Sequence, residues 1–386
     1  MKVTLLGTYP PTQCGLATFS HALRRAFLGS ASSVEVVRVV EHEDGFRAPE
    51  IAVQWRHGHP RDSERVLEAV RGRDVLVVQH EYGIFDGPDG VSIVEVVESS
   101  PVPVIVVLHT VLVEPTPTQR AILEAVAAAA DAVVTQTYAA RDRLISRYEV
   151  DERFVHVIPH GATANFEAAG RAGRSAERTT APATILTWGL LGPGKGLEYA
   201  IEAVAMLGDL DPAPRYLVAG ETHPKVVAAD GERYRRRLIE RAAELGVSDR
   251  VQFDGTYRAL DELRAIVRSA DLVLLPYESR EQVTSGVLVE ALASGKPVVA
   301  TAFPHARELL GGGAGLVVAH DDPMAMSAAL RSILVDPMLA ARMRHESRRV
   351  GSQHVWGVVG ARYFDLARTL VPATPGVDDG LALTAS

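Results

Sequence analysis

The amino-acid sequence predicts an α/β protein of two Rossmann-like, doubly wound domains that face each other across a cleft. Short runs rich in β-branched residues alternate with longer stretches of helical periodicity, which is the pattern of parallel strands joined by crossover helices. The alternation occurs twice along the chain, in two parts of similar length. The 386 residues are also more than one ordinary domain needs and suit two domains.

Six runs in the first half are expected to be strands. Several are apolar on both faces, as parallel strands covered by helices on each side must be. The expected strands span 3–7, 34–40, 75–79, 102–108, 132–136 and 154–158. Helical periodicity fills intervals between them, at 16–28, 61–71, 116–130 and 138–147. Strands and helices therefore alternate over 1–166, which we predict to be the first domain.

A segment without apolar periodicity separates the two halves. Residues 167–182 are rich in Ala, Gly, Arg, Ser and Thr and are expected to form a linker. The alternating pattern then resumes over 183–353, the second predicted domain. Its expected strands span 183–189, 215–220, 250–255, 271–276, 296–301 and 314–319. The small and polar residues 371–386 are expected to be a disordered tail.

Composition and charge argue against several classes of protein. The net charge is −8, with 40 basic and 48 acidic side chains spread along the chain, whereas a nucleic-acid-binding protein needs a concentrated basic face. The single cysteine, Cys14, excludes an intrachain disulfide and suits a reducing compartment. The first residues lack the pattern of a signal peptide, and no apolar run is long enough for a membrane span. We therefore expect a soluble cytoplasmic protein, with peripheral membrane contact left open.

The first motif with chemical content is a glycine-rich turn that follows the strand at 183–189. The turn holds four glycines and Lys195, and an amphipathic helix follows it. Such a turn lets backbone amides approach a phosphate, and the lysine adds a positive charge. The spacing also matches the start of a P-loop, but Gly196 stands where a P-loop needs Ser or Thr to hold Mg²⁺, which disfavours an NTPase. A purely structural glycine turn is the alternative.

The second motif spans 275–301 and contains a helix expected at about 284–294. Ser285 and Gly286 lie at the start of this helix, where free amides favour an anion. Glu290 lies about one turn further, and its carboxylate can accept two hydrogen bonds from a ribose diol. A glutamate on a solvated helix face is the alternative, but the apolar neighbours indicate a largely buried helix, in which an unpaired carboxylate is costly.

These motifs together resemble the group 1 glycosyltransferases (glycosyltransferase family 4, GT-B fold). The resemblance rests first on Lys195, about 95 residues before the run EALASGKPVVAT that begins at Glu290. Further segments are similar to the family's N-terminal glycine loop, its strand ending in an acceptor-side histidine, its hinge-proximal segment and its last helices, and these are 9–23, 106–110, 157–162 and 354–370.

The resemblance implies a GT-B fold and transfer of a sugar from a nucleotide-diphosphate sugar with retention of configuration. It implies no divalent metal and no other cofactor, and no Cys/His cluster has zinc spacing. The C-terminal domain would bind the donor, and the N-terminal domain would present a sugar, lipid-linked or small-molecule acceptor. The last helices, 354–370, would cross back onto the first domain.

Gln282 departs from the family pattern. The resemblance places a glutamate eight positions before Glu290, and this chain has an amide there. An amide hydrogen-bonds a sugar hydroxyl but offers no negative charge to an oxocarbenium-like centre. Glu281 or Glu278 could substitute for it after a shift of the loop.

Leu190 is the second departure, because many members of the family have an arginine there that clamps the diphosphate. Lys195 and the helix-terminal amides would then hold the diphosphate, with Arg280 or Lys225 as additional candidates. His223 either lines the donor pocket or orders its own loop.

The N-terminal half supplies four further candidates. His109 ends an expected strand, where it could hydrogen-bond the transferred sugar or the acceptor, and a satisfied core histidine is the alternative. Gly15 suits close approach of a ligand, unless it is a plain turn glycine. Glu81 and His80 follow another strand end and are acceptor-side candidates, with loop ordering as the alternative. His160 is a candidate for the donor pocket or for a loop-ordering role.

We therefore expect a retaining glycosyltransferase with His109 and Gln282 at the reacting sugar. The expected donor site comprises Gly15, Leu190, Lys195, Ser285, Gly286 and Glu290. A non-catalytic sugar-nucleotide-binding or accessory protein is the second hypothesis, and a sugar-nucleotide epimerase or phosphorylase on the same architecture is the third. A P-loop NTPase ranks last.

Overall fold

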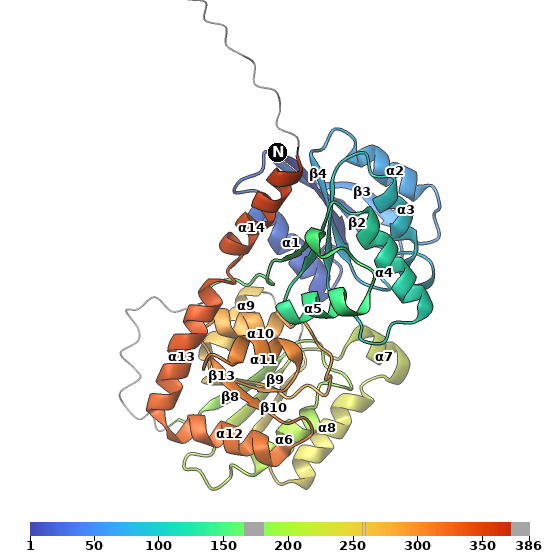
Figure 1. Ribbon diagram of the computed structural model, residues 1–386. Helices are drawn as coiled ribbons and strands as arrows, with labels where there is room; N and C mark the ends of the chain where they lie inside the picture. Colours follow the sequence, from blue (N-terminus) through green and yellow to red (C-terminus); the bar gives the residue numbers. More distant parts are fainter. Residues whose placement is uncertain (166–180, 257, 259, 372–386) are drawn as a thin grey trace, which may run out of the picture.

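The computed structural model describes residues 1–165, 181–256, 258 and 260–371. These residues form two α/β domains, an N-terminal one drawn in blue to green in Figure 1 and a C-terminal one drawn mainly in yellow to orange. The predicted linker lies outside the described residues except for 181 and 182, and the predicted tail lies outside them except for 371. The predicted α/β architecture of two Rossmann-like domains is confirmed by the two parallel sheets.

The N-terminal sheet has seven parallel strands in the order β3-β2-β1-β4-β5-β6-β7. The strands are β1 Lys2–Gly7, β2 Ser33–Val40, β3 Ile51–Arg56, β4 Val75–His80, β5 Val104–Leu108, β6 Ala132–Thr135 and β7 Val155–Val157. Because the strand order reverses between β1 and β4, a crevice is expected at the carboxyl ends of these two strands.

Helices cover both faces of the N-terminal sheet. Its helices are α1 Gly15–Phe27, α2 Asp62–Val70, α3 Ser92–Glu98, α4 Pro117–Ala129 and α5 Tyr138–Arg147, with the short 3-10 turns η1 Pro88–Gly90 and η2 Glu152–Phe154. One hydrophobic cluster joins the sheet to α2, α3, α4 and α5, and another joins its opposite face to α1 and α14. Burial on both faces explains the continuous apolar runs of the central strands.

The C-terminal sheet has six parallel strands in the order β10-β9-β8-β11-β12-β13. They are β8 Thr184–Trp188, β9 Arg215–Ala219, β10 Val251–Asp254, β11 Leu272–Leu275, β12 Val298–Thr301 and β13 Gly315–Val318. The helices are α6 Leu197–Ala205, α7 Pro224–Asp230, α8 Arg233–Glu244, α9 Leu260–Ser269, α10 Gly286–Ala293, α11 Pro304–Leu310, α12 Pro323–Val335 and α13 Pro337–Ser352. The order reverses between β8 and β11, which places the second crevice beside the glycine-rich turn.

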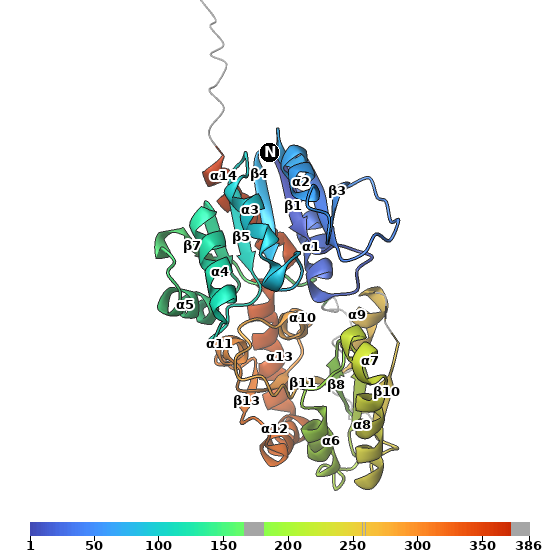
Figure 2. The ribbon, with the colours of Figure 1, turned by 90° about the vertical axis from the view of Figure 1, so that its right-hand side faces the viewer.

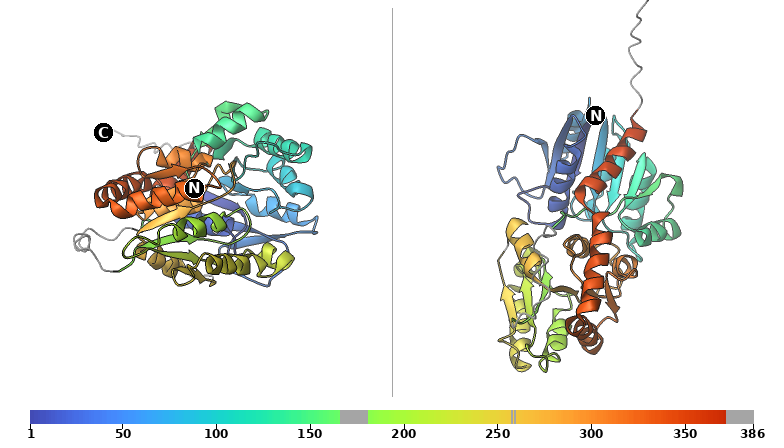
Figure 3. Two further views of the ribbon diagram at one scale, coloured as in Figure 1. Left: turned by 90° about the horizontal axis from the view of Figure 1, so that it is seen from below. Right: turned by 90° about the vertical axis from the view of Figure 1, so that its left-hand side faces the viewer.

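The last helix, α14 (Trp356–Leu370), runs from the C-terminal domain onto the N-terminal one, as the right-hand view of Figure 3 shows. Ala162 forms a parallel bridge with Val355 just before this helix. Gly360 then packs so closely on α1 that a Cβ atom there would lie 2.5 Å from the Cβ of Ala26. The two domains are therefore connected both by the segment before 165 and by α14.

Among the strands and α-helices of the N-terminal domain, two were not predicted from the sequence. The edge strand β3 has a mostly half-exposed pattern, and the short helix α3 lies in an interval for which no helix was expected. No single helix among the described residues is long and apolar enough to span a membrane. One pair of consecutive described helices, α12 and α13, has the length and apolar composition of a span when taken together, but the two helices are bent by 99° relative to each other.

Candidate functional site

The loops at the carboxyl ends of the two sheets meet where the domains face each other. Figure 2 shows α11 of the C-terminal domain next to α5 of the N-terminal domain. His160 lies so close to the start of α10 that a Cβ on Gly286 would lie 2.9 Å from its Nε2 atom. Arg143 of α5 pairs with Glu281 at 3.3 Å. The start of α10 and the loop before it thus lie against segments of the N-terminal domain.

The glycine-rich turn between β8 and α6 is shaped by close backbone contacts. Gly196 has a φ of 62°, and a Cβ there would lie 1.9 Å from the Pro276 carbonyl oxygen. Gly220 has a φ of 141°, and a Cβ there would lie 2.1 Å from the Gly189 carbonyl oxygen. Gly196 in the turn and Gly220, which follows β9, are therefore required by the backbone packing whether or not the turn binds a ligand.

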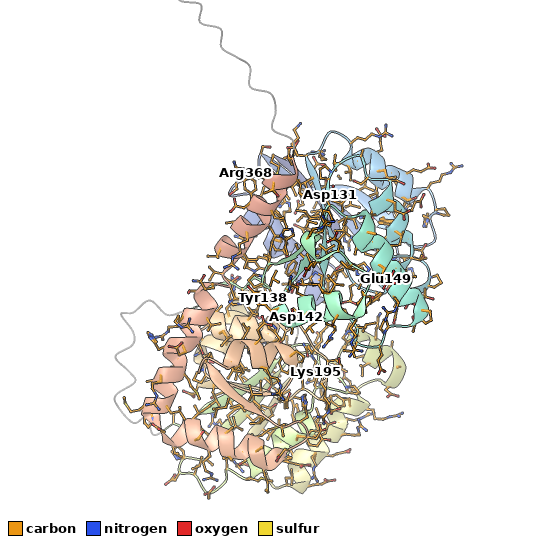
Figure 4. All side chains as sticks on the ribbon, in the orientation of Figure 1. Asp131, Tyr138, Asp142, Glu149, Lys195 and Arg368 are labelled. Carbon is orange, nitrogen blue, oxygen red and sulfur yellow. The ribbon has the colours of Figure 1, made fainter. Side chains whose placement is uncertain are left out.

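Lys195 lies half-buried in this turn. Its Nζ atom is 4.6 Å from the centre of the Tyr277 ring, and it forms no ion pair with any residue that the structure describes. Burial lowers the pKa of its ammonium group. A half-buried cation without a carboxylate is costly until an anion arrives, so this position suits a negatively charged ligand. In Figure 4, Lys195 lies in the C-terminal domain, below Tyr138 and Asp142 of α5.

Helix α10 begins next to this turn, because Val287 reaches to 4.0 Å from a Cβ built on Gly189. The side chain of Ser285 caps the helix by accepting from the Leu288 amide at 3.3 Å. The Ser285 amide itself donates to Nδ1 of His305 at 2.8 Å, which corrects the expectation that this amide is free. The Gly286 and Val287 amides have no hydrogen-bond partner within the described part of the chain.

Glu290 is half-buried on the second turn of α10 and is not on a solvated face. Burial raises the pKa of its carboxyl group, and Arg264 and the Trp188 indole partly oppose this shift. The carboxylate lines a small cavity together with Arg264, Ser294 and Asn165, which belongs to the segment that leaves the N-terminal domain. A buried carboxylate with spare acceptor capacity suits hydroxyl groups of a ligand.

Gln282 lies on the loop before α10 and is held by that loop. Its Nε2 atom donates to the Thr284 carbonyl at 2.9 Å. Of the two acids considered as substitutes, Glu281 is bound by Arg143, which also donates to its carbonyl at 2.9 Å. The amide of Glu278 donates to the Gly194 carbonyl at 3.0 Å, so this residue lies against the glycine-rich turn.

Leu190 brings no charge to the turn, and Arg280 does not supply the positive charge of the arginine that many members of the family have at position 190. The Arg280 guanidinium pairs with Asp321 at 3.1 Å and is exposed. Burial raises the pKa of Glu278, and Glu198 and Asp321 raise it further. The loop between β11 and α10 thus places an acidic side chain, Glu278, at the candidate site in addition to the backbone amides at the start of α10.

His109 directly follows β5, and both of its ring nitrogens are hydrogen-bonded. Its Nε2 donates to Oε1 of Gln79 at 2.8 Å, and its Nδ1 accepts from Nε2 of Gln136 at 3.2 Å. Phe19 packs edge-on against the ring at 4.9 Å. Burial lowers the pKa of His109 to about 3, so the ring is neutral at pH 7. A ligand that takes a hydrogen bond from this ring must displace one of the two amides.

Gln79 and Gln136 were missed at the level of the sequence. Each is a polar residue directly at the end of an apolar strand run, VVQ and VVTQ, and this placement was the available signal. Both side chains are buried, and each has one amide atom without a partner among the described residues, Nε2 in Gln79 and Oε1 in Gln136. The amide pair fixes the orientation of the His109 ring.

The other N-terminal candidates separate into buried and accessible residues. His80 is only 1% exposed and packs edge-on against Tyr82 at 5.3 Å, so it offers no surface to an acceptor and the expectation for it was wrong. Glu81 is half-buried and accepts from Thr110 Oγ1 at 2.5 Å, and burial raises the pKa of its carboxyl group. Gly15 is exposed, and a Cβ there would meet nothing within 4 Å, which leaves its backbone open to a ligand.

Comparison with known proteins finds a family model that matches much of the C-terminal half. Residues 174–350 match the family model described as "Glycosyl transferases group 1". The chain is 31% identical over 239 residues to a D-inositol 3-phosphate glycosyltransferase of Stackebrandtia nassauensis, covering 60% of this chain and 53% of the relative. A relative of the same name from Acidothermus cellulolyticus is 30% identical over 275 residues, covering 67% and 59%. The chain thus spans little more than half the length of the curated relatives it matches.

Solved structures share the whole fold. Anabaena HepE in complex with UDP superposes with a TM-score of 0.76 at 17% identity, covering 96% of this chain and all of that one. The sucrose-phosphate synthase of Thermosynechococcus elongatus superposes with a TM-score of 0.74 at 19% identity, covering 96% and 99%. At such low identity these likenesses establish the fold alone, which is the two-domain GT-B arrangement expected from the sequence.

Proposed function

We propose that this chain, whose residues 174–350 match the group 1 glycosyltransferase family model, transfers a sugar from a nucleotide-diphosphate sugar to a hydroxyl group of a small-molecule or lipid-linked acceptor. One observation carries the proposal. Lys195 is half-buried without a carboxylate in the turn that lies against the start of α10, and Glu290 lies half-buried on the second turn of the same helix. A cation and free amides suit a diphosphate, and a carboxylate beside them suits a ribose diol.

Transfer breaks the bond between the sugar's anomeric carbon and the diphosphate oxygen, forms a bond from that carbon to the acceptor oxygen, and passes the acceptor's hydroxyl proton to the leaving diphosphate. Negative charge grows on the leaving diphosphate, so Lys195 and the amides of Gly286 and Val287 would stabilise the transition state more than the bound donor. Retention of configuration and independence of metal follow from the family resemblance and stay predictions.

The N-terminal domain would hold the acceptor and the transferred sugar. His109 is neutral, so its role would be a hydrogen bond to a sugar hydroxyl and not proton transfer as an acid. Glu81 stands at the next strand end with a raised pKa and would accept a hydrogen bond from the acceptor. Closure of the two domains would bring these groups to the donor and exclude water.

The decisive experiment is a thermal-shift screen with UDP-, GDP- and ADP-sugars, begun with UDP because the superposed HepE binds it. A ligand at 100 times its Kd adds about 2.7 kcal/mol of stability. Lys195→Ala and Glu290→Ala should abolish the shift and the transfer of sugar to an acceptor. The proposal fails if both variants bind the donor and transfer sugar as well as the wild type.

A second function, a non-catalytic sugar-nucleotide-binding protein, is favoured by one observation. Gln282 stands where the family has a glutamate, and its amide is bonded to the Thr284 carbonyl. Gln282→Glu loses that donor and restores the acid. If the wild type binds a donor but neither protein turns it over with any acceptor, the binding function is the better description. Turnover by the wild type excludes it.

A further inference from the structure

We propose that the imidazole of His223 is the second ligand of the donor diphosphate, in the role that Leu190 leaves vacant. This inference rests on the proposed function, because it assumes that a diphosphate binds at Lys195. It extends that function by naming a residue at a place in the chain where the family resemblance gives no phosphate ligand.

The backbone around His223 is fixed directly beside the glycine-rich turn. The Leu191 amide donates to the Glu221 carbonyl at 2.8 Å, and the His223 amide donates to the Leu191 carbonyl at 2.8 Å. Leu191 and Thr222 thereby form a parallel bridge that extends the β8–β9 pairing past the ends of both strands. The first residues of the turn and the segment that carries His223 therefore form one rigid unit.

The turn closes on the same side. The Lys195 amide donates to the Gly192 carbonyl at 3.3 Å, and Val226 lies 3.2 Å from a Cβ built on Gly192. His223 and Lys195 are thus carried by two loops that touch each other. Their charges are coupled as well, because the pKa of His223 is lowered by burial first and then by Lys225 and Lys195.

The ring of His223 has one nitrogen engaged and one open. Nδ1 accepts from the Lys225 amide at 3.1 Å, so the neutral ring carries its proton on Nε2. The Nε2 atom has no partner among the residues that the structure describes, and the side chain is half-exposed. A neutral imidazole can therefore donate one hydrogen bond to a phosphate oxygen without losing a contact that it already makes.

Arg280 and Arg235 are engaged in other contacts, and Lys225 is exposed. Arg280 pairs with Asp321. Arg235 donates to the Gly220 carbonyl at 2.6 Å and pairs with Glu232 at 3.3 Å. Lys225 is exposed and strengthens the positive potential around His223 without being held near the turn.

The test uses inorganic pyrophosphate and UDP as probes, with binding measured by calorimetry. His223→Asn is the informative variant, because the shorter amide can still accept from the Lys225 amide at this helix start but cannot reach as far as Nε2. We expect an unchanged melting temperature and a Kd for both probes that is roughly threefold to thirtyfold higher, as befits one lost hydrogen bond to an anion. His345→Asn, on the exposed side of α13, is the matched control and should bind as the wild type does.

A rescue sharpens the assignment. Adding Leu190→Arg to His223→Asn restores a phosphate ligand at the position used by the family and should recover most of the lost affinity. If His223→Asn binds both probes like the wild type while Lys195→Ala does not, the role of His223 is refuted and the proposed donor site stands. If Lys195→Ala also binds both probes like the wild type, or if the wild type binds neither probe, the donor site itself is refuted and this inference with it.

Discussion

At the scale of single residues, Gly196 should be the least replaceable part of the glycine-rich turn. It combines a left-handed φ of 62° with a site where a Cβ would lie 1.9 Å from the Pro276 carbonyl oxygen. Gly196→Ala should therefore cost more than the roughly 1 kcal/mol of left-handed strain, because the turn must also move away from β11. We expect a lower midpoint of urea unfolding and weaker pyrophosphate binding.

Gly194→Ala is the matched control for that prediction. Gly194 has a φ of 89°, but a Cβ there would meet nothing within 4 Å. Gly194→Ala should therefore lower the free energy of unfolding by about 1 kcal/mol, which is the cost of placing alanine in the left-handed backbone conformation. Equal losses in the two variants would contradict the close approach to Pro276 as the cause.

The residues of the candidate site differ in how well the sequence predicts them. Lys195 and Glu290 follow from local pattern, because each lies next to the start of a helix at the end of a buried strand. The engagement of the Ser285 amide by His305, 20 residues away, and of Glu281 by Arg143, 138 residues away, depends on tertiary contacts. Local periodicity contains no information on such partners, so the sequence could not show which groups are already satisfied.

At the scale of elements, α5 carries the contacts that hold the two domains together on one side. The carboxylate of Glu308, on α11, accepts from the amides of Tyr138 and Ala139 at 3.1 Å each. One turn further, Arg143 pairs with Glu281. A carboxylate at a helix N-terminus is favoured by the free amides and by the helix dipole, so α11 and α5 form a contact that breaks when the domains open.

Glu308→Ala should therefore favour the open arrangement. The loss of two exposed, charge-assisted hydrogen bonds is about 1 kcal/mol, or roughly a fivefold change in the closure equilibrium. We expect a larger radius of gyration in X-ray scattering and a higher KM for the donor, while kcat at saturation changes less. Glu308→Gln keeps one acceptor and should lie between the two. Superimposable scattering curves for all three proteins would show that this contact does not control closure.

Most elements were predictable because burial on both faces of a parallel sheet leaves long apolar runs. The helix predicted at 138–147 coincides with α5, and the twelve predicted strands are all present. Strand β3 was not predicted because it lies at the edge of the sheet. Only Trp55 of this strand is buried, so the strand has no continuous apolar run. Helix α3 was not predicted because its seven residues are too few to show helical periodicity.

At the scale of the whole molecule, buried histidines should make stability fall in mild acid. Burial lowers the pKa of His80 and His160 to about 4 and of His109 and His305 to about 3. The unfolded chain protonates these rings near pH 6.5, whereas the folded chain does not. The neutral rings therefore contribute fully to the stability of the folded state above pH 6.5, and this contribution is lost as the pH falls towards 4.

The expected loss is large for the fold. At pH 5 each of these rings should lower the free energy of unfolding by on the order of 2 kcal/mol relative to pH 7, since one pKa unit corresponds to about 1.4 kcal/mol. Glu81, Glu278 and Glu290 oppose the trend, because their raised pKa values let the folded state take up protons first. We expect the melting temperature to drop by several degrees or more between pH 7 and pH 5.

One variant isolates the histidine contribution. His80 is 1% exposed, touches no carboxylate, and has its pKa lowered by burial alone, so His80→Gln should flatten the pH dependence of the melting temperature even if it lowers stability at pH 7. The exposed His345→Gln should leave the slope unchanged. A melting temperature that stays constant from pH 7 to pH 5 in the wild type would mean that water reaches these rings in the folded protein. In that case the interface between the domains is wetter and more open in solution than the close packing of His160 against Gly286 requires.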